Sequence, residues 1–142
     1  MVRPIKRIMA GLTQTLESIP GIGPIFAAGI IAEIGQIERF DDETKIAKYA
    51  GLYWRTHQSG RFTAENTSLS RNGNHYLRYY LVEAANSVRK HVSDYQEYYV
   101  KKYNEVPKHK RALVLTARKF VRLVDALLRN HQLFTPERCV KV

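Results

Sequence analysis

Apolar residues recur at intervals of three and four along most of this chain, which is the spacing of one face of an α-helix. The pattern predicts helices over about residues 10–18, 24–34, 40–50, 74–92, 94–104 and 110–130. Pro24 suits a first helical turn, and Gly35 and Gly51 suit positions just past a helix end. The sequence therefore predicts a mainly all-α fold, with a helix–hairpin–helix followed by a loop and long packed helices.

Residues 52–73 lack this periodicity and are rich in polar and aromatic residues. The glycine, serine and asparagine in this stretch favour turns, and a short hairpin around Gly60 is one alternative. A long irregular segment inside a compact domain is usually functional. We therefore expect the functional loop of the domain here.

Two adjacent acids, Asp41 and Asp42, stand where the helix over 40–50 begins. Adjacent acids can mark a metal site. Acids at a helix start also accept hydrogen bonds from free backbone N–H groups and interact favourably with the helix dipole. We favour the helix cap, and the sequence predicts no set of metal ligands.

The turn over residues 19–24, with the sequence IPGIGP, joins the first two predicted helices. Glycine adopts positive φ without a steric penalty, so Gly21 and Gly23 permit a tight reversal around Ile22. We expect the backbone amides of these three residues to point outward at a helix N-terminus, which favours binding of a phosphate. The alternative is a pair of helices packed for stability alone.

Positive charge dominates the 142-residue chain, which has 23 Lys+Arg, 13 Asp+Glu and a net charge of +10. A globular chain this basic usually binds a polyanion, with nucleic acid as the first candidate and a membrane surface as the second. No apolar run reaches the roughly 18–20 residues of a bilayer span, and residues 1–7 show no signal peptide. The single Cys139 has no companion for a disulfide or a metal site. We therefore expect a cytoplasmic protein without a membrane partner.

The helix over 110–130 carries a basic stripe. Arg111, Arg118, Arg122 and Arg129 stand at offsets that place all four within about 40° of one line along the helix. This stripe is either a solvated face or a surface that follows a phosphate backbone.

Four tyrosines, Tyr95, Tyr98, Tyr99 and Tyr103, group on the helix over 94–104. Tyrosines can stack on bases, but spacings of three and four residues are those that packing requires. We favour packing in the core or at an interface for this group.

One constellation in the predicted loop supports chemistry. Ser59 stands beside Gly60, with Arg55, His57 and Arg61 close in sequence. A serine hydroxyl becomes a nucleophile when a base accepts its proton and cations stabilise the developing charge. The alternative is that Ser-Gly simply forms a turn.

Several short motifs occur in an order and spacing that resemble a known family. They are Ile19-Pro20-Gly21-Ile22-Gly23, Ala28, Glu33-Ile34-Gly35, Phe40, Tyr49-Ala50-Gly51-Leu52, Gln58-Ser59-Gly60, Ser70-Arg71-Asn72-Gly73-Asn74, Tyr76-Leu77-Arg78, Leu81-Val82-Glu83-Ala84-Ala85, Ala112-Leu113 and Leu127-Leu128-Arg129. Together they are similar to the C-terminal transposase domain of the IS-one-ten/IS-one-sixteen/IS-nine-hundred-two insertion-sequence family of prokaryotes, whose members include bridge-RNA-guided serine recombinases. The resemblance divides the chain into a lead-in or the end of a preceding linker helix at 1–10, the transposase domain at 11–130, and a tail at 131–142. The helix–hairpin–helix occupies 11–35.

This resemblance implies that Ser59 attacks a DNA phosphodiester and forms a covalent phosphoserine link. The residues expected to contact nucleic acid are Gly21, Ile22, Gly23, Arg55, Arg61, Arg71, Arg78, Arg111, Arg118 and Arg122. An N-terminal nuclease domain is implied, and its carboxylates hold Mg²⁺, so we expect no cofactor in this chain. The implied partners are DNA, a structured guide RNA in some members, that nuclease domain, and a second copy of the chain in a homo-oligomer.

The implied protein is nucleoid-associated, and the chain alone is expected to bind nucleic acid without cutting it. Whether the chain is an enzyme by itself stays open. The alternative function, from another class, is a stand-alone helix–hairpin–helix module that binds nucleic acid and has no catalytic residue.

Overall fold

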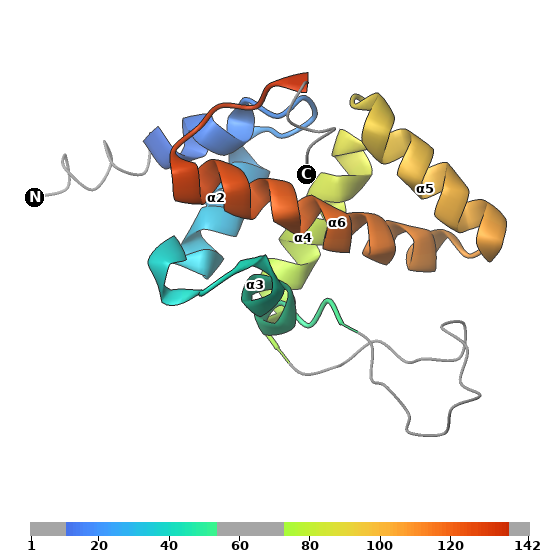
Figure 1. Cartoon of the computed structure of the whole chain (residues 1–142), viewed down its shortest axis with the longest axis horizontal. Helices are drawn as coiled ribbons and strands as arrows, with labels where there is room; N and C mark the ends of the chain where they lie inside the picture. Colours follow the sequence, from blue (N-terminus) through green and yellow to red (C-terminus); the bar gives the residue numbers. More distant parts are fainter. Residues whose placement is uncertain (1–10, 54–72, 137–142) are drawn as a thin grey trace, which may run out of the picture.

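The computed structural model of the chain describes residues 11–53 and 73–136 (Figure 1). Residues 11–17 are helical. The elements that follow are α2 (Pro24–Ile34), the 3-10 turn η1 (Ile37–Arg39), α3 (Glu43–Tyr49), α4 (His75–Val88), α5 (Ser93–Glu105) and α6 (His109–Asn130). These residues form helices and no strand, which confirms the predicted all-α fold.

The helix starts follow the signals read from the sequence. α2 begins at Pro24, and Gly35 follows its end with a φ of 68°. α3 begins after Asp42, whose side chain accepts hydrogen bonds from the backbone N–H groups of Thr44 and Lys45. The prediction that this acid caps a helix is confirmed, since the carboxylate satisfies N–H groups that no helical carbonyl reaches.

The prediction of one helix over 74–92 is wrong at its end, because α4 stops at Val88. The backbone N–H groups of His91 and Val92 both donate to the Val88 carbonyl, at 2.9 and 2.8 Å. This tightened turn redirects the chain into α5. The apolar period continued past the helix end because Val92 still packs against the core.

α6 lies at the centre of the fold and contacts η1, α3, α4 and α5. It runs across the molecule in Figure 1, where α4 crosses it and α5 folds back beside it. Its inner face is fully buried at Ala117, Phe120 and Val124. An amphipathic helix of this length buries one stripe against several neighbours, so α6 organises the core.

The turn before α2 and α2 itself each pack closely against α4 at a glycine. Gly21 has a φ of 98°, and its carbonyl accepts a hydrogen bond of 2.6 Å from the Ser87 hydroxyl. A Cβ on Gly21 would lie 2.9 Å from the Ser87 carbonyl oxygen, and one on Gly29 would lie 2.6 Å from the Tyr80 ring. These positions therefore require glycine for backbone conformation and for close approach.

The tyrosines of α5 mostly serve packing. Tyr95 is 2% exposed and meets Phe120 edge to face, with 6.0 Å between the ring centres. The Arg89 guanidinium lies 4.1 Å from the centre of the Tyr99 ring, which stacks on Tyr103 at 6.1 Å. Packing is confirmed for Tyr95, and the outer rings support the α4–α5 corner.

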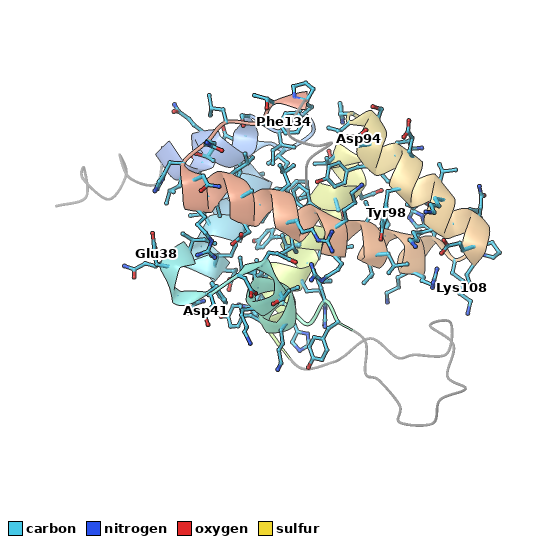
Figure 2. The ribbon with its side chains drawn as sticks, in the orientation of Figure 1. Glu38, Asp41, Asp94, Tyr98, Lys108 and Phe134 are labelled. Atoms are coloured by element: carbon cyan, nitrogen blue, oxygen red, sulfur yellow. The ribbon has the colours of Figure 1, made fainter. Side chains whose placement is uncertain are left out.

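The chain after α6 packs back on the molecule. The Phe134 backbone N–H donates to the Ser18 hydroxyl at 2.8 Å, and its ring lies partly buried against the core (Figure 2). None of the helices within 11–53 and 73–136 is long and apolar enough to cross a bilayer.

Candidate nucleic-acid interface

Four of the predicted site residues, Arg55, Ser59, Arg61 and Arg71, lie outside the described residues. The structure does describe the chain on both sides of the segment that carries them, residues 54–72. These flanking residues show how the domain holds the segment.

The described chain on either side of that segment meets at the end of α3, in a contact that we call the neck. The backbone N–H of Asn74 donates to the Tyr49 carbonyl at 2.7 Å. Gly73 has a φ of 113°, and a Cβ there would lie 2.6 Å from the Tyr49 carbonyl oxygen and 2.8 Å from the Gly51 nitrogen. The approach is too close for any side chain, so glycine allows the loop to close at this neck.

The Asn74 side chain connects three helices at the neck. Its Oδ1 accepts hydrogen bonds of 3.0 Å from the backbone N–H groups of Tyr76 and Leu77, which caps α4. Its Nδ2 donates to Glu33 Oε2 at 2.8 Å and to the Tyr49 hydroxyl at 3.2 Å. We call Glu33, Tyr49 and Asn74 the neck network; it joins α2, α3 and the start of α4.

Arg39 supports this network from η1. Its guanidinium lies 4.8 Å from the centre of the Phe40 ring and 5.0 Å from that of Tyr49, and its Nε donates to the Ile34 carbonyl at 2.8 Å. The hydrogen bond from Asn74, followed by that from Arg39, lowers the pKa of the Tyr49 phenol below its ordinary value. Both donors stabilise the ionised form of the phenol.

Sequence analysis assigned no role to the neck network. The preference of asparagine for helix starts was a readable signal at Asn74. Its partners Glu33 and Tyr49 stand 41 and 25 residues earlier, beyond the reach of any local pattern.

The predicted accessible helix N-terminus of the glycine hairpin is present at Gly23. Gly23 caps α2 with a φ of −92°, and a Cβ there would meet nothing within 4 Å. The next two N–H groups, of Ile25 and Phe26, belong to a first helical turn, where no carbonyl four residues earlier accepts them. This end of α2 is therefore accessible to a phosphate.

Ile22 differs from the prediction. Its N–H donates to the Ile19 carbonyl at 3.1 Å, and its side chain is 6% exposed. The expectation that all three hairpin amides point outward is therefore wrong at Ile22, because the turn uses this amide internally and the core takes up the side chain.

The basic stripe of α6 is largely engaged within the protein. Both terminal nitrogens of Arg118 donate to the Glu43 carboxylate, Nη2 to Oε1 at 3.3 Å, and Arg122 Nε lies 3.6 Å from the same oxygen. Arg129 binds Asp125 and donates to the Phe40 carbonyl at 2.9 Å. The stripe holds the start of α3 and the preceding turn against α6.

Two arginines of the stripe are more open. Arg111 Nη1 donates to the Lys102 carbonyl at 3.5 Å, a weak contact, and the Arg122 side chain is 51% exposed. Arg78 lies half-buried one turn into α4, beside the neck, where its Nη2 meets His75 Nδ1. Phosphate contact by these arginines stays a prediction.

Charge is unevenly placed over the described surface. Figure 2 shows Glu38 and Asp41 at the corner formed by η1 and α3, and Lys108 at the opposite end of the molecule, where α5 turns into α6.

Residues 11–53 and 73–136 contain no group of three His, Cys, Asp or Glu side chains placed to hold a metal ion.

The described residues form a small helical domain with a glycine hairpin, an arginine stripe on α6 and the neck network, and comparison with known proteins makes the assignment specific. The model of the transposase IS116/IS110/IS902 family matches residues 13–100. The chain belongs to this family.

Individual relatives agree with the family model. The chain is 33% identical over 123 residues to an uncharacterized 44.8 kDa protein of insertion element IS116 from Streptomyces clavuligerus, covering 87% of this chain and 31% of that protein. It is 30% identical over 124 residues to the transposase for insertion sequence element IS1111A from Coxiella burnetii, covering 85% and 34%. The chain thus spans about a third of the length of these relatives.

Proposed function

We propose that this chain is the nucleophile-bearing, nucleic-acid-binding domain of an insertion-sequence transposase that acts on DNA. Membership of the transposase family carries this proposal. The net charge of +10 supports the choice of a polyanionic partner.

In the proposed reaction the Ser59 hydroxyl oxygen attacks a DNA phosphorus. A phosphorus–oxygen bond forms to the serine, the bond to a deoxyribose oxygen breaks, and that oxygen takes up a proton as it leaves. Arg55, Arg61 and Arg71 neutralise the charge that develops on the phosphate oxygens. In the second step a hydroxyl of the strand to be joined attacks the same phosphorus, and the serine oxygen leaves and takes up a proton. The energy of the phosphodiester is therefore conserved in the serine ester between the two steps.

The neck network has a clear part in this scheme. It joins α2, α3 and the start of α4 through residues that flank 54–72 in the sequence. A nucleophile must be held within a fraction of an ångström of its target, so the support around a loop contributes to its reactivity.

Mg²⁺ would supply stabilisation of the leaving oxygen, and we assign it to the carboxylates of a nuclease domain rather than to this chain. We accordingly expect the chain alone to bind nucleic acid without nicking it.

The decisive experiment uses a full-length transposase that contains this domain. Wild-type protein and the Ser59→Ala and Ser68→Ala variants are incubated with a DNA substrate, and covalent protein–DNA adducts are trapped in denaturant. We expect the adduct and strand exchange to be lost in Ser59→Ala and retained in Ser68→Ala, a serine of the same segment. DNA affinity should be equal in all three proteins.

A stand-alone binding module remains the alternative, and the accessible N-terminus of α2 at Gly23 favours it. It predicts that Ser59→Ala is silent and that substitution of Gly23 abolishes binding. An adduct that persists in Ser59→Ala would reject the nucleophile assignment and leave this alternative.

Binding itself is measured across a salt series with duplex DNA and with structured RNA, so that a guide-RNA partner is tested in the same assay. The slope of log K against log salt approaches about −0.9 per phosphate contacted on duplex DNA. Arg122→Gln should lower this slope, because the Arg122 side chain is 51% exposed and its contact with Glu43 is long, at 3.6 Å. Arg118 is a poorer probe, because both of its terminal nitrogens bind Glu43 and its substitution opens that closer contact.

Self-association is tested separately, by sedimentation of the chain over a range of concentration. The outer tyrosines of α5, such as Tyr103 at 40% exposed, provide the surface for a homo-oligomer in this proposal. A clean monomer at high concentration would exclude it for the chain alone.

A further inference from the structure

The first turns of α4 expose two aromatic side chains. Tyr76 is 72% exposed and Tyr79 is 59% exposed, whereas Tyr95 on α5 is 2% exposed. Residues three apart on a helix lie on neighbouring turns of one side, so the two side chains leave the helix from adjacent positions. Exposed aromatic surface of this kind is typical of a binding site.

The Tyr79 ring packs against a second tyrosine of α4. Its neighbour Tyr80 meets it edge to face, with 5.6 Å between the ring centres. Tyr80 in turn lies over Gly29 of α2, where a Cβ would come within 2.6 Å of the ring. Since Tyr80 cannot move inward, Tyr79 is supported and loses little side-chain freedom on binding.

Positively charged side chains occur near these rings. Arg78 occupies the same turns of α4, and α3, which contacts the start of α4 through the neck network, exposes Lys45 and Lys48. Figure 1 shows the start of α4 against α3 at one edge of the molecule. Half-buried Glu83 is the acid one turn beyond Tyr79. Aromatic faces among cations match unpaired bases on a phosphate backbone.

We propose that Tyr76 and Tyr79 form a stacking surface for unpaired bases of a single-stranded nucleic-acid segment bound beside the neck. This inference rests on the proposed function, because it requires that the domain binds nucleic acid. Bases inside a duplex are already stacked on each other, so an intact duplex gains nothing from these rings. The surface therefore selects opened or looped strands.

The test measures binding of fluorescein-labelled oligothymidine and of a duplex of equal length to the 142-residue chain across a series of salt concentrations. The variants are Tyr76→Ala, Tyr79→Ala and the corresponding Tyr→Phe changes, with Leu133→Ala as the control at a residue that is 60% exposed. Each alanine variant at the surface should weaken single-strand binding about fivefold or more, since stacking contributes about 1–3 kcal/mol per base.

Further results are expected if stacking is the cause. Each Tyr→Phe variant binds within about twofold of wild type, because phenylalanine keeps the ring face. The salt slope does not change, because no phosphate contact is lost. Duplex affinity and the urea midpoint of unfolding also stay at their wild-type values, as does the affinity of Leu133→Ala.

Other outcomes separate the two proposals. If wild type binds oligothymidine and the alanine variants bind it equally well, the stacking surface is refuted while the proposed function stands. Equal loss on duplex and single strand would also refute it, since the rings would then contact the backbone. If wild type binds no nucleic acid at low salt, both proposals fail.

Discussion

Replacing Asn74 with alanine should lower the free energy of unfolding by about 2–3 kcal/mol. Loss of its cap on the N–H groups of Tyr76 and Leu77 accounts for about 1 kcal/mol. Its bond of 2.8 Å to the Glu33 carboxylate adds about 1.5 kcal/mol, the lower end for a hydrogen bond to a charged group because the pair is only part-buried. The longer bond to the Tyr49 hydroxyl adds little.

Two variants separate the cap from the neck network. Asn74→Ser keeps an oxygen that caps α4 but removes the amide donor, so we expect it to lose about half as much stability as Asn74→Ala. Asp42→Ala removes the cap of α3, whose recorded partners are local. It should therefore destabilise the chain less than Asn74→Ala does.

The assay is urea unfolding followed by far-ultraviolet circular dichroism. A shift of the midpoint at constant slope reports stability directly. A second readout is the pKa of the Tyr49 phenol, followed by nuclear magnetic resonance. Because the bond from Asn74 is the main cause of its lowered pKa, both Asn74 variants should raise that pKa toward the ordinary value, and Asp42→Ala should not.

The reasoning would be refuted if Asn74→Ser were as stable as wild type and left the Tyr49 pKa unchanged. The side chain would then act only as a helix cap, and the neck would be held by backbone contacts alone.

Three further predictions concern the rest of the described fold. Gly21→Ala should cost about 2 kcal/mol or more, because of its positive φ and close contact, whereas Gly23→Ala should stay within about 0.5 kcal/mol by urea unfolding; equal effects would contradict this. A double-mutant cycle on Arg118→Gln and Glu43→Gln should give a coupling of about 0.5–2 kcal/mol, and a coupling near zero would show that the ion pair does not hold α3 to α6. The hydrogen bond from the Thr44 hydroxyl lowers the pKa of the Asp42 carboxyl. The contribution of this carboxyl to stability is therefore complete above its ordinary pKa and is lost as pH falls through the lowered pKa. Asp42→Asn should flatten this part of the acid-unfolding profile, and an unchanged profile would contradict the prediction.

Local chemistry determined the helices. Pro24 and Gly35 set the bounds of α2, and Asp42 and Asn74 set the starts of α3 and α4, as expected from the sequence. Each signal works through atoms within about four residues, which is why it could be read without the fold. The family was also readable, because its motifs extend over most of the chain, and the family model matches residues 13–100.

The candidate site was only partly readable. The resemblance selected Ser59, which lies outside the described residues, so its role stays a prediction. The periodicity of α6 placed its arginines on one line, but it did not show which residues cover that line. In the structure, Glu43 of α3 binds Arg118 and Arg122.

Packing alone decided which similar side chains differ in role. Tyr95 and Tyr76 both stand on amphipathic helices, yet one lies in the core and the other is 72% exposed. Asn74 reaches Glu33 across 41 residues of sequence. The sequence by itself determined the helices, because their ends depend on neighbours along the chain; only the tertiary structure decided the neck, the covered arginines and the exposed tyrosines, because these depend on which helix faces meet.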